Sequence, residues 1–330
     1  MKHYMFAMVC LLLVTACKEN TSSLEIAVDE KLLLNAIKII SSDDMEGRFF
    51  GTEGNYKTQA YLAQQFDSLG IEPALTAGSI QKFPHTFSGK SRQRRYPIIN
   101  PAEDFSNVPD TTIIGGNVVT MIKGKLEKTI VITAHLDHLG VKEGEIFNGA
   151  DDDASGAAAL LAIANYFKDK APQHNLIFAA VDAEEIGSFG CTYLLENFPI
   201  PIENIVLNVN MDMIAHNDAS ELYASGLYHY PQLQQPLDAL KGSKIKLVYG
   251  HDDPNDSKLD DWTFSSDHRV FHKQGIPFIY FGVEDHKDYH KATDTFENIN
   301  QAFYIEAVRL IIEAIEAYDS FLVSTSKDVL

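Results

Sequence analysis

Four short polar clusters in the sequence carry side chains that can bind metal ions or transfer protons. Each contains imidazole or carboxylate groups and lies at the end of an apolar run or close behind one; they occupy residues 134–137, 149–156, 181–187 and 208–214. A fifth polar segment, 289–295, comes late in the chain. Open α/β folds keep their active sites at the carboxyl edge of the sheet, so we expect these clusters to converge on one centre.

The first two clusters combine an imidazole with closely spaced carboxylates. His135 and Asp137 stand two residues apart, so on an extended backbone their side chains point the same way. Asp137 can then accept the second ring N–H of His135, which fixes the tautomer that a metal-bound imidazole needs. The consecutive aspartates 151–153 repel one another unless cations neutralise them, and a helix N-terminus relieves only part of that repulsion. Both clusters favour a cation site.

Two further clusters place carboxylates after apolar runs. Glu184 and Glu185 are adjacent and face different directions, so one can bind a metal ion while the other works as a base. Asp212 follows an apolar run, where a buried carboxylate is costly unless it is paired or bound to a cation. Each cluster alone also fits an ordinary solvated loop. Their occurrence together at predicted strand ends is what indicates a metal centre.

The elements that must position these side chains alternate along the chain. Apolar runs predict strands at 117–122, 129–133, 175–181, 205–210 and 278–281, and helical spacing or composition predicts helices at 29–42, 55–69, 154–167, 187–195, 231–240 and 301–321. Strands separated by helix-length segments predict an α/β fold, a three-layer sandwich with a mostly parallel central sheet and helices on both faces.

Length and charge agree with one large domain and argue against nucleic acid as a partner. The chain has 330 residues and a formal charge of −19. This length suffices for one α/β domain with a sizeable core. The phosphates of nucleic acid need a basic surface, so we expect no nucleic-acid partner.

The N-terminal segment is predicted to be an export signal. The apolar run at 5–14 is too short to span a bilayer, and residues 14–17 resemble a bacterial lipobox. We therefore expect a lipoprotein signal peptide at 1–16, lipid on Cys17, a tether at 17–28 and a single domain without an insertion at 29–330. The protein would be anchored to a bacterial membrane in the cell envelope, on the periplasmic or cell-surface side. Only Cys191 would remain free, so no intrachain disulfide is expected.

Taken together, the motifs resemble those of one enzyme family. A-H-L-D, G-A-D-D-D-A-S-G, A-E-E-I-G, N-M-D-M and Y-H-K-A-T-D-T, with the glycine-rich lead-in at 43–54, resemble the two-zinc exopeptidases that include bacterial leucyl aminopeptidases, glutamate carboxypeptidase and, more distantly, glutaminyl cyclases. The resemblance covers residues 39–312. It implies the zinc exopeptidase fold and two Zn²⁺ ions as cofactors.

The resemblance assigns five metal ligands: His135 and Asp212 on one ion, Glu185 and His290 on the other, and Asp152 bridging both. It also implies a cis peptide bond after Asp152. Two histidines and three carboxylates without thiolates suit zinc in an open catalytic site, and manganese or cobalt could occupy the same ligands.

Three further residues receive catalytic roles from the resemblance. Glu184 would be the general base, Asp137 would orient His135, and Tyr289 would stabilise the oxyanion. The implied activity is aminopeptidase action on peptide substrates with a free N-terminus, through a hydroxide shared by the two ions.

Other functions within the same fold stay open. A glutaminyl cyclase would use a single zinc ion, a dipeptidase or carboxypeptidase would share the metal centre, and an inactive binding module would have lost the base. Four other histidines match no ligand position, and we expect them on the surface or behind the ligands: His138, His216, His251 and His286. Asp267 and His268 are expected behind the ligands or in the pocket wall, and not as ligands.

Overall fold

The computed structural model describes residues 26–88, 109–240 and 244–325. The predicted signal peptide, Cys17 and most of the predicted tether lie outside the described residues, so the predicted domain limits stay predictions. In the parts that the structure describes, no helix is both long and apolar enough to cross a membrane.

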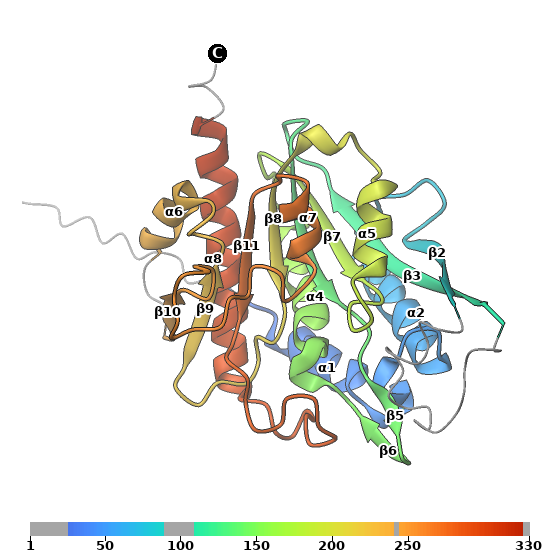
Figure 1. The fold of residues 1–330 in the computed structure, drawn as a ribbon. Helices are drawn as coiled ribbons and strands as arrows, with labels where there is room; N and C mark the ends of the chain where they lie inside the picture. Colours follow the sequence, from blue (N-terminus) through green and yellow to red (C-terminus); the bar gives the residue numbers. More distant parts are fainter. Residues whose placement is uncertain (1–25, 89–108, 241–243, 326–330) are drawn as a thin grey trace, which may run out of the picture.

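Four parallel strands form the centre of the main sheet. They are β7 (Asn175–Val181), β4 (Thr129–His135), β8 (Ile205–Met211) and β11 (Phe278–Gly282), in that spatial order. Strands β4 and β7 are buried along their whole length, as continuous apolar runs in a parallel sheet should be. Their parallel alignment brings the carboxyl ends of all four to one edge of the sheet (Figure 1).

Antiparallel neighbours extend the sheet on both sides. Strand β3 (Thr111–Ile122) runs antiparallel to β7 and pairs with β1 (Glu72–Pro73) and β2 (Ile80–Phe87). At the other side, β9 (Glu221–Ser225) runs antiparallel to β11 and is followed by β10 (Lys246–Tyr249). A separate hairpin, β5 (Gly140–Lys142) and β6 (Glu145–Phe147), follows β4.

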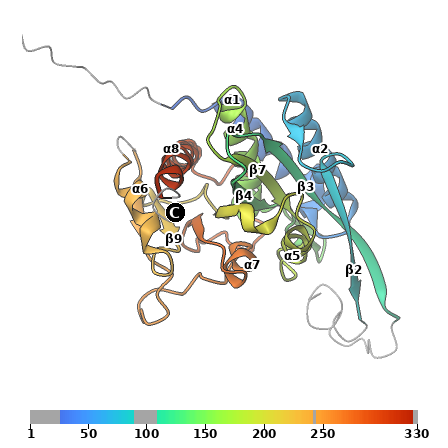
Figure 2. The same ribbon diagram turned by 90° about the horizontal axis from the view of Figure 1, so that it is seen from above.

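Helices cover both faces of the sheet, which confirms the predicted three-layer arrangement (Figure 2). One face carries α1 (Glu30–Ile40), α2 (Glu53–Ser68), α4 (Gly156–Phe167) and α8 (Gln301–Thr325); α6 (Gln234–Asp238) packs on α8. The opposite face carries α5 (Phe189–Glu196) and α7 (His268–Lys273). Helix α4 is apolar on nearly all sides and is correspondingly buried between the sheet and other helices.

Local sequence signals account for several element ends. Asp29 caps α1 by accepting a hydrogen bond from the backbone N–H of Leu32 at 2.9 Å. Gly70 follows α2 with a φ of 76°, a conformation that glycine adopts without steric cost. The helix predicted from residue 154 begins only at Gly156, because Ala150–Ser155 forms a kinked turn in which Asp152 and Asp153 have non-helical backbone angles.

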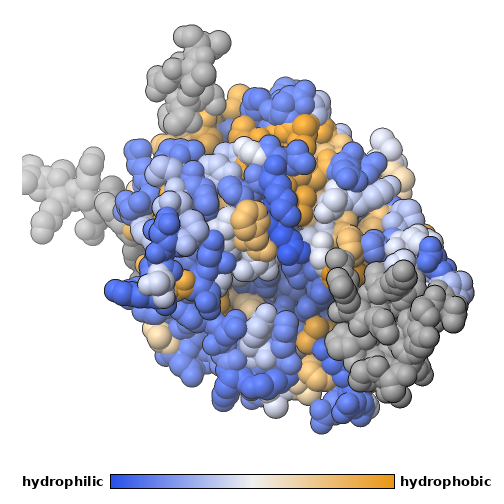
Figure 3. Space-filling view, viewed as in Figure 1, coloured by the Kyte–Doolittle hydropathy of each residue, from blue (hydrophilic) through white to orange (hydrophobic). Residues whose placement is uncertain are grey.

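The sequence did not predict strands β9 and β10. Both are short, and their places depend on pairing with β11 and with each other, which no local pattern encodes. The face of the molecule that Figure 3 shows is mainly hydrophilic, in keeping with the strongly acidic composition.

Candidate metal centre

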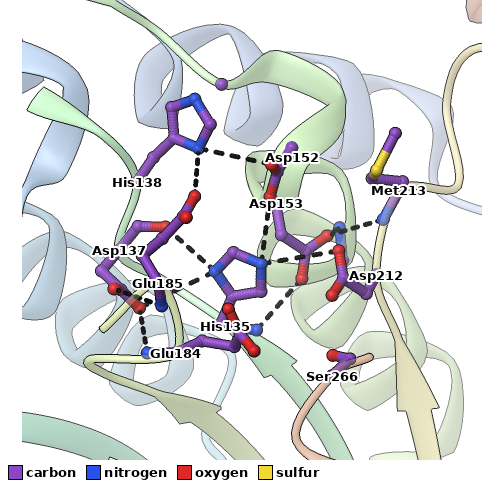
Figure 4. A network of polar contacts seen from close by, with 12 residues as sticks. His135, Asp137, His138, Asp152, Asp153, Glu184, Glu185, Asp212, Met213 and Ser266 are labelled. Carbon is purple, nitrogen blue, oxygen red and sulfur yellow. Dashed lines mark hydrogen bonds and ion pairs between the residues drawn. The ribbon is translucent and has the colours of Figure 1, made fainter. Parts of the chain in front are cut away.

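The predicted ligands lie where the four parallel strands end, and Figure 4 labels His135, Asp152, Glu185 and Asp212 among them. His135 is the last residue of β4, Asp212 follows β8 directly, and Glu185 lies in the turn after β7. Asp152 comes from the kinked turn before α4, and His290 from the loop after β11. All five predicted ligands therefore meet at the carboxyl edge of the sheet, as expected for an open α/β fold.

Asp152 lies between two pairs of ligands. Its Oδ1 is 3.1 Å from Nε2 of His135, and this nitrogen is also 3.5 Å from Oδ1 of Asp212. Its Oδ2 is 3.1 Å from Nε2 of His290, which is 3.8 Å from Oε2 of Glu185. Zinc binds nitrogen and oxygen ligands at about 2.0–2.2 Å, so two ligand atoms on one ion lie no more than about 4.4 Å apart. Both pairs satisfy this limit, and so does the distance from Asp152 to the histidine of each pair.

The charge distribution at these ligands shows a deficit of positive charge. Burial and then the nearby Asp152 raise the pKa of Glu185 to about 8. Burial acts to lower the pKa of His135, but Asp212, Asp137 and Asp152 outweigh it and raise this pKa well above its ordinary value. Both groups would thus hold protons that divalent cations can replace. The donor set and its electrostatics fit two zinc ions.

The carboxylate of Asp137 holds the glutamates rather than the histidine. Its two oxygens accept the backbone N–H groups of Glu184 at 3.0 Å and Glu185 at 3.3 Å. Nδ1 of His135 lies 3.0 Å from the backbone carbonyl of Asp137, but 3.7 Å from its nearer carboxylate oxygen. The sequence predicts that the carboxylate takes this N–H. The carbonyl orients the ring instead, because β4 ends at His135 and the alternation of an extended strand stops there.

The neighbours of Asp152 in the acidic triplet fix the turn that carries it. Asp153 accepts hydrogen bonds from the backbone N–H groups of His135 at 3.0 Å and Gly156 at 2.8 Å. Asp294 accepts the backbone N–H groups of Asp151 at 2.9 Å and Asp152 at 3.1 Å. The peptide bond between Asp152 and Asp153 is cis, as the resemblance implied.

A cavity of about 280 Å³ lies at the centre and is lined by the five predicted ligands and Tyr289. Glu184 lines the same cavity. Burial raises the pKa of Glu184 well above its ordinary value. Its Oε1 lies 3.5 Å from Oγ of Ser188 and 3.6 Å from Nη2 of Arg269. Glu184 thus faces the cavity beside the ligands, in a position to exchange a proton with a molecule bound there.

Tyr289 lies against the last predicted ligand. Its ring stacks on that of His290 with 3.9 Å between ring centres, and it is half-buried. Burial raises the pKa of its hydroxyl, so this group stays protonated and can donate a hydrogen bond to an oxygen in the cavity.

His138 lies behind the ligands, which is one of the two places that the sequence predicts for it. This residue is fully buried, and its Nδ1 lies 2.9 Å from Oε1 of Glu185 and 3.6 Å from Oδ2 of Asp152. Burial lowers the pKa of its ring to about 4, which leaves a neutral imidazole beside two predicted ligands. His138 follows Asp137 directly, in a turn that bends back toward the ligands, and this position brings its ring against Glu185.

The other polar residues near the motifs have different surroundings. His251 stacks on Trp262, a residue of the cavity wall, with ring centres 3.5 Å apart. Asp267 and His268 are fully buried and do not line the cavity, which rules out the pocket wall and leaves the predicted place behind the ligands. The backbone carbonyl of Asp267 accepts a hydrogen bond from the thiol of Cys191, with 3.6 Å between sulfur and oxygen.

Arg48 connects the segments that carry two of the ligands, a role that sequence analysis did not assign. Its fully buried guanidinium donates to four backbone carbonyls: Ile40 at 3.0 Å, Leu136 at 2.9 Å, Gly149 at 2.9 Å, and Asn148. The Leu136 carbonyl directly follows His135, and the Asn148 and Gly149 carbonyls precede the turn of Asp152. No local pattern predicts such a contact.

Comparison with protein families and curated proteins agrees with this centre. Peptidase family M28 matches residues 117–315, which is more than half of the chain. The alkaline phosphatase isozyme conversion protein of Escherichia coli is 26% identical over 217 residues, which cover 62% of this chain and 56% of that protein. Aminopeptidase YwaD of Bacillus subtilis is 26% identical over 225 residues, which cover 64% of this chain and 45% of that protein. The chain thus spans about half the length of these curated relatives.

Solved structures share the fold at low sequence identity. An aminopeptidase from Aneurinibacillus sp. strain AM-1 superposes with a TM-score of 0.67 at 17% identity, covering 87% of this chain and 93% of that one. A glutaminyl cyclase from Porphyromonas gingivalis gives 0.66 at 17% identity, covering 87% and 98%. Because both enzymes fit about equally well, this likeness establishes the fold and does not separate the two activities.

Proposed function

The chain belongs to peptidase family M28, and on that premise we propose that it is an exported zinc aminopeptidase that hydrolyses N-terminal peptide bonds. The observation that carries the proposal is the position of Asp152, with one oxygen toward His135 and the other toward His290. A bridging carboxylate between two ligand pairs suits two metal ions, whereas a one-zinc cyclase needs only one of these pairs.

The side chains around the centre divide the reaction between them. Two zinc ions bound there would polarise the scissile carbonyl and lower the pKa of a water molecule. Glu184 takes a proton from the attacking water and delivers it to the departing amine. The Tyr289 hydroxyl donates a hydrogen bond to the oxygen that becomes negative. Asp137 sets the positions of Glu184 and Glu185 through their backbone N–H groups.

The cavity wall favours a substrate with a free amino group over one with a free carboxylate. Besides the predicted ligands and Glu184, three aspartates line the described cavity: Asp260, Asp261 and Asp285. Among the described residues that line it, none is lysine or arginine. A carboxypeptidase needs a cation to hold the terminal carboxylate of its substrate, whereas an α-ammonium group is attracted by these aspartates. This supports aminopeptidase over carboxypeptidase activity.

A substrate panel with one substitution tests the proposal. The purified protein should hydrolyse aminoacyl reporter substrates and free peptides but not N-blocked peptides, and a chelator should abolish the activity. Glu184→Gln should lower kcat by about a hundredfold to ten-thousandfold with metal content unchanged, because only the base is removed. Glu196→Gln, at an exposed position at the end of α5, serves as the matched control and should keep full activity.

Each alternative would give a different result. Hydrolysis of N-blocked peptides would identify an endopeptidase or carboxypeptidase, and cyclisation of N-terminal glutamine without hydrolysis would identify a cyclase. Binding of peptides without turnover would identify an inactive module. Retained activity in Glu184→Gln would refute the assignment of the base.

A further inference from the structure

We propose that a further divalent metal ion binds next to the candidate metal centre, in a separate site formed by His216 and Asp288 with His286 beside them. His216 lies in the segment after β8, and the other two residues lie in the loop after β11. One ligand atom from each of the three lies within 4.8 Å of the others. None of the three is among the five predicted ligands of the catalytic centre.

Two buried atoms in this cluster face each other without hydrogen-bond partners. Nδ1 of His216 and Oδ2 of Asp288 make no hydrogen bond within the part of the chain that the structure describes, and each residue is only 5% exposed. The two atoms are 3.9 Å apart, too far for a hydrogen bond. Buried polar atoms are rarely left unsatisfied, because they lose their contact with water without gaining a partner in the protein. A third atom bound between them would satisfy both.

The surrounding contacts hold both atoms in place. Thr293 donates a hydrogen bond to the other oxygen of Asp288 at 2.7 Å. The rings of His216 and His286 stack with their centres 4.0 Å apart. Nε2 of His286 is 3.0 Å from Oδ2 of Asp151, and its Nδ1 accepts the backbone N–H of Asp288 at 3.2 Å. The gap between His216 and Asp288 is therefore set by three neighbouring segments and does not depend on one flexible side chain.

The space between Nδ1 of His216 and Oδ2 of Asp288 suits a transition-metal ion better than a proton that links the two side chains. Burial and the nearby His286 lower the pKa of His216, so at neutral pH its ring is uncharged and does not form an ion pair with Asp288. Zinc–nitrogen and zinc–oxygen bonds of about 2.0–2.2 Å add up to slightly more than the 3.9 Å between the two atoms, so one ion can contact both. An imidazole with a carboxylate suits Zn²⁺, Ni²⁺ or Cu²⁺.

His286 plays a supporting part. Its ring lies within 19° of parallel to that of His216, so the two rings cannot both direct a lone pair in their own planes at one ion. A metal ion would bind first to His216 and Asp288, and His286 would become a ligand only by turning out of this stack. For this reason the proposal depends on His216 and Asp288.

Metal counting tests the site without reference to catalysis. The purified full-length protein is equilibrated with excess Zn²⁺, passed through a desalting column, and analysed for metal per chain by mass spectrometry. The parent protein should carry one zinc ion more than His216→Gln, one more than Asp288→Asn, and one more than the double variant. Asn at position 288 keeps an oxygen for Thr293, so this variant preserves the local hydrogen bond and guards against misfolding.

Matched variants separate this site from the catalytic one. His272→Gln, in the short helix α7 and outside both clusters, should keep the parent zinc content. Glu185→Gln removes a predicted catalytic ligand, and the loss of an ion caused by His216→Gln should persist in that background. Equal zinc content in the parent and His216→Gln would overturn the proposal and leave a water molecule as the occupant of the gap. The difference between these two proteins is informative even if the catalytic centre holds fewer than two ions.

Discussion

Replacing Arg48 by methionine should destabilise the protein and lower its activity. Methionine has a comparable length and no donor, so the substitution removes a donor from four buried carbonyls, those of Ile40, Leu136, Asn148 and Gly149. The Gly149 carbonyl keeps a second hydrogen bond, from the backbone N–H of Ala154 at 3.2 Å. The side chain is fully buried, so water has little access to these carbonyls. The loss should therefore appear in both stability and the geometry of the candidate metal centre.

The magnitude follows from the four hydrogen bonds and the burial of the charge. Hydrogen bonds from a charged donor contribute about 1.5–3 kcal/mol each, which gives an upper limit on the order of 10 kcal/mol for four. Burying the guanidinium offsets several kcal/mol of this. We expect Arg48→Met to lower the free energy of unfolding by about 3–5 kcal/mol, the loss typical when one partner of a buried charged contact is removed. Activity should fall at least about tenfold, because small displacements of catalytic groups are costly.

Urea unfolding and steady-state kinetics measure the two effects. Arg48→Lys should be almost as damaging, since one ammonium group cannot reach carbonyls on three separate segments. Arg309→Met is the matched control: this arginine lies on α8, away from the centre, and donates to the Ile26 carbonyl and to Glu306. Its loss should cost less than the loss of Arg48, because one backbone carbonyl loses a donor where Arg48→Met affects four. An Arg48→Met protein that unfolds within about 1 kcal/mol of the parent and keeps its kcat would refute the reasoning.

Three further predictions concern the membrane anchor, acid stability and substrate binding. Cys17→Ser should move the protein from the membrane to the soluble fraction of expressing cells, and unchanged membrane association would refute lipidation. Asp319 accepts a hydrogen bond from His174 at 2.8 Å; burial acts to raise its pKa, but His174 and backbone N–H groups outweigh this and lower it from 3.8. Asp319→Asn should therefore be less stable than the parent at pH 7, and this difference in urea unfolding should vanish as the pH falls below 3.8 through the lower pKa of the folded state. A difference that persists in acid would contradict this linkage. Asp285→Asn should raise KM for substrates with a free amino group more than it lowers kcat, and an unchanged KM would remove Asp285 from amine binding.

The central fold could be predicted because its strands are buried on both faces. A parallel strand between two layers of helices reads as a continuous apolar run, so β7 was predicted at the residues where it occurs, Asn175–Val181. Polar residues placed directly after such runs must then lie at the same edge of the sheet. The pattern of apolar runs alone therefore places His135, Glu185 and Asp212 together.

The remaining features depend on contacts between distant segments. Strand alternation predicts that Asp137 reaches His135, but β4 ends at His135 and the carboxylate instead binds the turn after β7. The burial of His138 against Glu185 results from the same bend. Arg48 is 88 residues from Leu136 and 101 from Gly149 along the chain, so its contacts leave no local pattern.

The position of Asp137 explains how adjacent glutamates can have different tasks. Two neighbouring carboxylates in a flexible turn would exchange roles, and either could bind the ions. Here one carboxylate accepts both backbone N–H groups, which fixes the peptide units of Glu184 and Glu185 and directs their side chains to different places. Glu185 contacts His138 and faces His290, while Glu184 faces the cavity beside Ser188. Loss of the Asp137 carboxylate in Asp137→Ala should therefore reduce both metal affinity and kcat, whereas an effect on orienting His135 alone would lower metal affinity and spare the base.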